Sequence, residues 1–87
     1  MEKNLQNFVK IIGEPTRLRI LNHLKKDCCV GELWESLNLP QNLTSHHLKI
    51  LRDFKLINSD KRGLKVIYCL NKKELNKNLK LLNEYLK

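Results

Sequence analysis

Apolar residues recur every three or four positions along most of the chain, which is the spacing of helices that bury one face. This spacing predicts helices at residues 4–12, 16–26, 32–37 and 41–54, and in the segment after Asn71. Gly13 ends the first helix, and Pro15 fits the first turn of the second. Asn71 is a helix-capping residue in front of the last leucine stripe. The chain is therefore expected to be mainly α-helical.

The segment between the fourth and the last helix has a different pattern. Residues 56–59 and 64–70 are rich in β-branched residues that alternate with other types, and residues 60–63, Asp-Lys-Arg-Gly, lie between them. This indicates a β-hairpin with a basic tip. Residues 27–30 are too few for a helix and are interpreted as a short extended link.

The order of these elements is four helices, a hairpin and a final helix. Two helices that are joined by a short turn and followed by a basic hairpin are typical of a winged helix-turn-helix. A chain of 87 residues suffices for one domain with a modest core. The sequence thus predicts a single winged helix-turn-helix DNA-binding domain over residues 1–87, mainly α with a small β-hairpin.

The fourth predicted helix has an apolar side and a polar side when it is drawn at about 100° per residue. The apolar side holds Leu43, Leu48, Ile50, Leu51 and Phe54. The polar side holds amide, hydroxyl, imidazole and cationic groups, at Gln41, Asn42, Ser45, His46, Lys49 and Arg52. Such groups can contact base edges and phosphates in a major groove. We expect this side to be the recognition surface, with an ordinary solvated helix face as the alternative.

The histidines do not indicate catalysis. His47 lies in the middle of the apolar side of the fourth helix, so a packed, hydrogen-bonded core histidine is expected there. His23 and His46 also lie on predicted helices without a nucleophile beside them, and the chain has neither a Gly-rich phosphate loop nor paired acids. An enzyme is therefore not expected.

The charge of the chain favours a polyanionic partner. Lys and Arg number 17 against 9 Asp and Glu, for a formal net charge of +8, and such an excess attracts nucleic acid through phosphate contacts. Lys61, Arg62 and Lys65 suit a wing that lies against the DNA backbone, with a solvated turn as the alternative. We expect double-stranded DNA as the partner. With no long apolar stretch and no secretory signal, a cytoplasmic location without a membrane partner is expected.

Taken together and in this order, the segments resemble the ArsR/SmtB family of metal- and stress-responsive repressors. The matching pieces are residues 14–21, 29–33, 41–52, 62–63 and 66–70. The resemblance implies a homodimer that is closed by the first and last helices. It also implies that the free repressor binds an operator with dyad symmetry and that an inducer releases it.

The leucine spacing of the terminal helices agrees with such a dimer. These two helices offer more apolar surface than so small a domain can cover alone, although part of each stripe must pack on the chain's own core. The expected interface consists of Leu5, Phe8, Ile12, Leu75, Leu79, Leu82 and Leu86.

The inducer site is where the sequence departs from the family. Thiol-type metal sensors of this family carry Cys-Val-Cys at the start of the third helix, whereas here Cys29 matches the first ligand and Gly31 replaces the second. Members with a zinc site at the dimer interface carry Asp and His on the last helix, and this last helix has neither.

A different thiol site remains open. In winged helices the segment before the third helix commonly pairs with the second wing strand, which would bring Cys69 near Cys28 or Cys29. These thiols could hold a soft metal or metalloid ion such as arsenite, or two of them could oxidise. Adjacent Cys28 and Cys29 point to opposite faces of an extended segment, and free cysteines are often only small buried hydrophobes. Sensing and simple packing are both kept as interpretations.

Two other functions remain as alternatives. One is a winged-helix DNA-binding regulator that has no ligand and is controlled by its abundance. The other is a winged helix that binds protein, for which an acidic or apolar fourth-helix face would be typical; here that face is polar and basic.

Overall fold

The computed structural model describes residues 3–26, 29–30 and 33–87, and for residues 29–30 it describes the backbone alone. In this part of the chain five helices and three strands follow one another. They are α1 (Lys3–Ile12), α2 (Pro15–Leu24), β1 (Cys29–Val30), α3 (Leu33–Ser36), α4 (Gln41–Asp53), β2 (Ile57–Arg62), β3 (Lys65–Leu70) and α5 (Lys72–Tyr85). The order is the one predicted from the sequence, with the extended link forming β1.

The three strands form one antiparallel sheet in the order β1-β3-β2. The hairpin runs from the pair Ile57–Leu70 to the pair Arg62–Lys65, so that only Gly63 and Leu64 form its tip. We expected a longer tip over residues 60–63, and this was wrong because β2 keeps pairing with β3 through Arg62. Gly63 has a φ of 64°, and a glycine at the first position of a two-residue turn is a favoured way to close a hairpin.

The core lies where α1, α2, α4 and the base of the hairpin meet. Phe8 of α1 is fully buried, and its ring lies 6.4 Å from that of Phe54, which follows α4. The buried apolar residues are Leu5, Phe8, Ile20, Leu21, Leu24, Leu33, Leu37, Leu48, Leu51, Leu56 and Ile57.

Two leucines that have the spacing of a buried helical stripe are exposed. Leu18 of α2 is 50% exposed and Leu43 of α4 is 40% exposed. Ile20 is buried in α2, and Thr44 is buried in α4, where its hydroxyl donates to the Pro40 carbonyl at 3.0 Å. The spacing gives the angle between side chains around the helix axis. It does not give the side of the helix on which neighbouring elements pack, and that packing decides which residues are buried.

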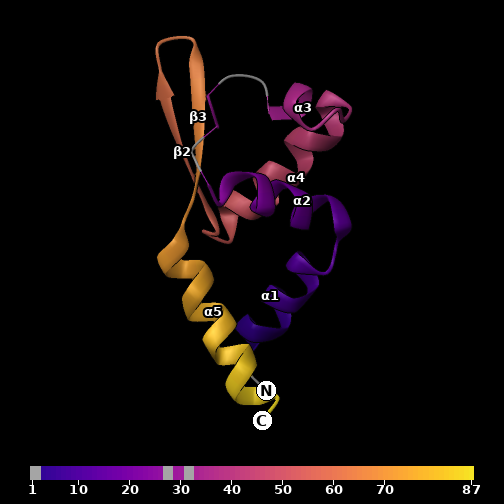
Figure 1. Ribbon diagram of the computed structural model, residues 1–87, viewed down its shortest axis with the longest axis vertical. Helices are drawn as coiled ribbons and strands as arrows, with labels where there is room; N and C mark the ends of the chain where they lie inside the picture. Colours follow the sequence, from indigo (N-terminus) through magenta and orange to yellow (C-terminus); the bar gives the residue numbers. More distant parts are fainter. Residues whose placement is uncertain (1–2, 27–28, 31–32) are drawn as a thin grey trace.

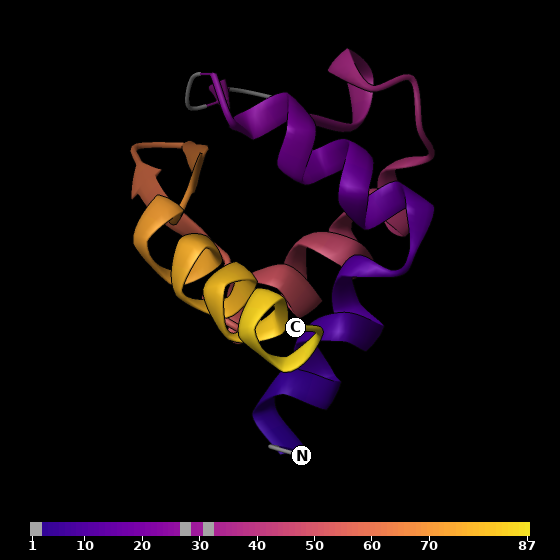
Figure 2. The ribbon, with the colours of Figure 1, turned by 60° about the horizontal axis from the view of Figure 1, so that its bottom comes forward.

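The molecule is elongated, with principal extents of 43 × 22 × 20 Å. Both termini lie at one end, where α1 and α5 converge, and the hairpin extends at the other end, at which α3 also lies (Figure 1). Seen from the terminal end, α5 and the hairpin lie on one side, and α2 and α3 lie across from them (Figure 2). In the described part of the chain, no helix has the length and apolarity that crossing a membrane requires.

Candidate nucleic-acid interface

The outer face of α4 presents a continuous set of polar and basic side chains. All six predicted recognition residues are exposed: Gln41, Asn42, Ser45, His46, Lys49 and Arg52. No acidic residue lies in the first turn of α4, and no side chain caps it. The start of the helix therefore keeps its partial positive charge, which favours a nearby phosphate.

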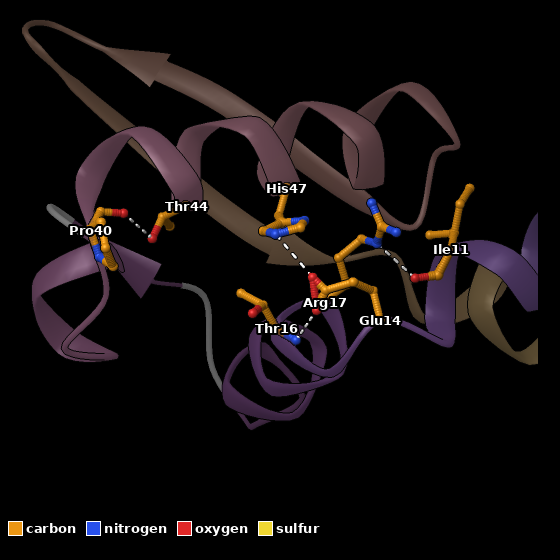
Figure 3. A network of polar contacts seen from close by, with 7 residues as sticks. All are labelled: Ile11, Glu14, Thr16, Arg17, Pro40, Thr44 and His47. Atoms are coloured by element: carbon orange, nitrogen blue, oxygen red, sulfur yellow. Dashed lines mark hydrogen bonds and ion pairs between the residues drawn. The ribbon is translucent and has the colours of Figure 1, made fainter.

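The inner face of α4 is fixed by buried contacts. Thr44, His47, Leu48 and Leu51 are its buried residues. His47 Nε2 lies 3.0 Å from Glu14 Oε2, so that α4 is joined to the residue that precedes α2 (Figure 3). The His47 side chain is 7% exposed. This confirms the prediction of a packed and hydrogen-bonded histidine at this position.

Glu14 has two tasks in this contact. Its carboxylate accepts a hydrogen bond from the Thr16 amide and so caps α2, while it also meets His47 (Figure 3). Partial burial opposes ionisation of Glu14, but the Thr16 hydrogen bond and the nearby His47 and Arg17 outweigh it, and its pKa lies below the usual value. Sequence reasoning missed this role; a glutamate before Pro15 was the available signal, since acidic residues favour helix starts.

Burial is the main reason why the pKa of His47 lies below its usual value. Loss of water lowers its pKa, Glu14 raises it, and Arg17 and His46 lower it further, so that the net shift is downward. Among the described residues, His47 Nδ1 is buried without a hydrogen-bond partner. A proton on Nδ1 would be a buried hydrogen-bond donor without an acceptor among the described residues. The tautomer that carries its hydrogen on Nε2 instead donates to Glu14.

Two arginines of α2 are engaged in structural contacts. Arg17 Nε donates to the Ile11 carbonyl at 2.8 Å, and an Arg19 guanidinium nitrogen donates to the Leu37 carbonyl at 2.9 Å. These bonds tie α2 to the end of α1 and to the end of α3. They also mean that part of the positive charge of the chain stabilises the position of the helices.

The hairpin presents its basic residues to solvent. Lys61, Arg62 and Lys65 are all exposed. Arg62 Nε lies 3.0 Å from Asp60 Oδ2, and both side chains are largely exposed. Residues two apart in a strand share a face. A sequence reading that assigned residues 60–62 to a strand would therefore have predicted the ion pair between Asp60 and Arg62. Leu64 at the tip is fully exposed.

The structure describes one of the three cysteines in full. Cys69 is half-buried on β3 and is disulfide-bonded. Cys28 and the side chain of Cys29 lie outside the described residues. The pairing of β1 with β3, in which Cys29 is opposite Tyr68, confirms the expected adjacency of these two segments. In the described ranges, no three His, Cys, Asp or Glu side chains gather as metal ligands.

The residues predicted for a dimer interface divide into three groups. Leu5 and Phe8 are buried in the core of the chain itself and are not available as surface. Ile12, Leu75 and Leu82 are half-buried against that core. Leu79 is 42% exposed and Leu86 is 72% exposed. Val9 and Tyr85, which we did not single out, are also exposed on these helices.

Comparison with known proteins gives the same picture. The family described as "Bacterial regulatory protein, arsR family" matches residues 14–59, more than half of the chain. The chain is 36% identical over 85 residues to the arsenical resistance operon repressor of Staphylococcus xylosus, covering 93% of this chain and 82% of the relative. It is 37% identical over 68 residues to the transcriptional repressor SdpR of Bacillus subtilis, covering 77% of this chain and 76% of the relative.

Solved structures share the fold. HlyU from Vibrio cholerae has a TM-score of 0.76 at 30% identity and covers 100% of both chains. An ArsR family transcriptional regulator, RHA00566, has a TM-score of 0.80 at 20% identity, covers 97% of this chain and 88% of its own, and supports the fold alone. The predicted winged helix-turn-helix is thereby confirmed.

Proposed function

Because the chain belongs to the arsR family of bacterial regulatory proteins, it is a DNA-binding transcriptional repressor, and we propose that it acts as a homodimer on an operator with dyad symmetry. In this proposal α4 enters the major groove and the hairpin follows the backbone beside it. The terminal helices join the two copies.

The observation that carries the proposal is the two-sided character of α4. Its outer face offers amide, hydroxyl, imidazole and cationic groups, as at Ser45 and Lys49, while His47 and Leu51 hold its inner face against the core. A reading helix has to keep its position while its outer side chains meet base edges. Lys61 and Arg62 lie next to the tip of the hairpin, and the hairpin extends at the end of the molecule that lies away from the termini (Figure 1).

The opposite end of the molecule supports the proposed dimer. Leu79 and Tyr85 of α5, and Leu86 directly after it, leave apolar surface exposed, and α5 converges with α1 at the terminal end of the molecule (Figure 1). A second copy related by a two-fold axis would cover this surface, since isologous contacts use the same patch twice. Joined there, the two copies would present two reading helices to half-sites about one helical turn apart.

The proposal is tested on the DNA upstream of the chain's own gene, with random DNA of equal length beside it. Ser45→Ala and Lys49→Ala remove groups from the reading face, so each should reduce discrimination between the two DNAs by about 1–3 kcal/mol. Lys61→Ala and Arg62→Ala remove phosphate contacts, so each should weaken binding to both DNAs alike. Each should also lower the slope of log affinity against log salt concentration by about one. Gel shifts over a range of salt concentrations give both quantities.

Lys80→Ala is the matched control, because Lys80 is an exposed lysine on α5 at the terminal end. It should leave discrimination unchanged. Equal losses on both DNAs for all four variants would contradict the division between the reading helix and the wing.

For release from DNA we propose a thiol event at Cys69 with Cys28 or Cys29. Repressors of arsenical resistance operons are among the relatives, which supports a soft metalloid ion as one effector class. A disulfide sulfur is no thiolate ligand, so the disulfide-bonded form of Cys69 fits oxidation better than ion binding. An oxidant such as peroxide would take two electrons and two protons from the two thiols. The bond formed would tie β3 to the segment before α3.

The test is the variant with Cys28→Ser, Cys29→Ser and Cys69→Ser, assayed for operator binding with arsenite, cadmium, zinc and peroxide. The reduced wild type should release DNA on peroxide, and the variant should not. Equal behaviour of the two proteins would mean that the cysteines serve packing alone. In that case a regulator without a thiol effector, controlled by its abundance, is the better description.

A further inference from the structure

A pocket of about 380 Å³ lies between α3, the first half of α4 and β3. This volume is in the range of small-molecule sites in proteins, about 300–1,000 Å³. Because its lining residues come from both α4 and β3, the pocket lies between the reading helix and the wing strand, where both would approach DNA.

One part of the pocket wall is apolar and aromatic. Trp34 of α3 and Tyr68 of β3 line it, together with Leu33, Leu48 and Val66. Small-molecule sites are lined mainly by such side chains, with a few polar groups that orient the ligand. The wall suits a flat apolar body.

The other part of the wall is polar and cationic. Gln41 and Ser45 of α4 line it, and Lys65 of β3 supplies a positive charge. Thr44 also lines the pocket, but its hydroxyl already donates to the Pro40 carbonyl. Among the described residues, none that lines the pocket is acidic, so a ligand with one negative charge is favoured over a cation.

We infer that this pocket binds a small amphipathic organic acid, with its apolar body against Trp34 and Tyr68 and its carboxylate toward Lys65. Gln41, Ser45 and Lys65 are also proposed DNA contacts, and a ligand that occupies them competes with the operator. A ligand that binds only the DNA-free form shifts the population toward that form. This regulatory part rests on the proposed function; binding of the acid does not.

Trp34 is the single tryptophan of the chain, so its fluorescence reports on this pocket without any DNA. The probe is 4-tert-butylbenzoate, compared with 4-tert-butylbenzyl alcohol, which has the same apolar body and no charge. We expect a saturable fluorescence change with the acid and about tenfold weaker binding of the alcohol, because a charge-assisted hydrogen bond to Lys65 is lost.

Two lysine variants separate a pocket contact from general charge. Lys65→Gln should reduce affinity for the acid to that of the alcohol. Lys61→Gln removes the same charge from the other strand of the hairpin, is not a lining residue, and should bind the acid as the wild type does. Val66→Phe, which fills the pocket, should weaken the binding of both the acid and the alcohol.

The fluorescence titrations and the gel shifts fail independently. Absence of saturable binding, equal binding of acid and alcohol, or equal losses in both lysine variants would overturn the site, whether or not the chain binds the operator. If the acid binds but the operator complex survives at saturating acid, the competition with DNA is overturned and the site stands.

Discussion

His46 and His47 are neighbours in the sequence and have opposite roles in the structure. His46 is exposed on the outer face of α4, and His47 is buried against Glu14. Their rings lie 5.2 Å apart, edge to face. Along a helix, adjacent residues point about 100° apart, so one position separates a side chain that can meet DNA from one that holds the helix in place.

The lowered pKa of His47 predicts a dependence of stability on pH. The folded chain binds a proton at His47 less readily than the unfolded chain, whose His47 pKa is near 6.5. Stability should therefore be fully present above pH 6.5 and should fall as the pH drops below it. His47→Gln should remove this part of the slope and cost about 1 kcal/mol at pH 7, the contribution of one hydrogen bond. Urea unfolding at a series of pH values measures both.

His23→Gln is the control, because His23 is exposed on α2. Between pH 5 and 7, a range that includes the usual histidine pKa, this variant should keep the wild-type dependence of stability on pH. A His47→Gln protein with an unchanged slope in that range would show that another group titrates there. The lowered pKa of Glu14 adds a further loss of stability only at pH values below about 4.5.

At the scale of elements, Asn71 connects the wing to the last helix. Its side-chain oxygen accepts a hydrogen bond from the Glu74 amide at 3.3 Å and caps α5. Its side-chain nitrogen donates to the Lys55 carbonyl at 3.0 Å, and its own amide donates to the Leu56 carbonyl. One residue thus ends the hairpin, begins α5 and holds both against the end of α4.

Replacing this residue should loosen the junction. Asn71→Ala removes the cap and the bond to Lys55, so we expect a loss of about 1–2 kcal/mol in the free energy of unfolding. Asn76→Ala is the control, because Asn76 is an exposed residue within α5, and it should change stability little or raise it. Denaturant unfolding compares the two variants. Equal stability of both would contradict the stabilising role of Asn71 at this junction.

At the scale of the whole molecule, the long axis separates two ends with different chemistry. The hairpin and the start of α4 carry exposed basic and polar residues and lie toward one end, while α1 and α5 converge at the other end (Figure 1). In the proposed dimer, this separation along 43 Å of length would let one end associate with a second copy while the other stays free for DNA.

The dimer is predicted to depend on the exposed leucines of α5. The double variant Leu79→Ser/Leu86→Ser removes apolar surface that the chain leaves uncovered, so it should weaken association without unfolding the monomer. Sedimentation at micromolar concentration should give a mass near twice 10.3 kDa for the wild type and a lower mass for the variant.

Leu64→Ser is the matched control, since Leu64 is fully exposed at the opposite end, on the hairpin tip. It should leave the mass unchanged. A wild type that stays monomeric even on DNA would rule out the dyad arrangement.

Local features of the sequence were enough to predict most of the elements. Gly13, Pro15 and Asn71 mark helix ends through their own backbone and side-chain preferences, and the structure has ends at these positions. The outer face of α4 was also predictable, because a helical period of 3.6 residues separates polar from apolar positions without help from other segments. The buried position of His47 follows from the same period.

Only the tertiary structure decided the features that depend on distant segments. Glu14 meets His47 because α2 crosses α4, and no local pattern contains that crossing. Leu18 and Leu43 are exposed because the described segments leave these two side chains partly uncovered, although their spacing is that of a buried stripe. β2 runs on to Arg62 because β3 offers hydrogen-bond partners that far. Short-range preferences shape each element, and packing between elements determines which of their surfaces remain for binding.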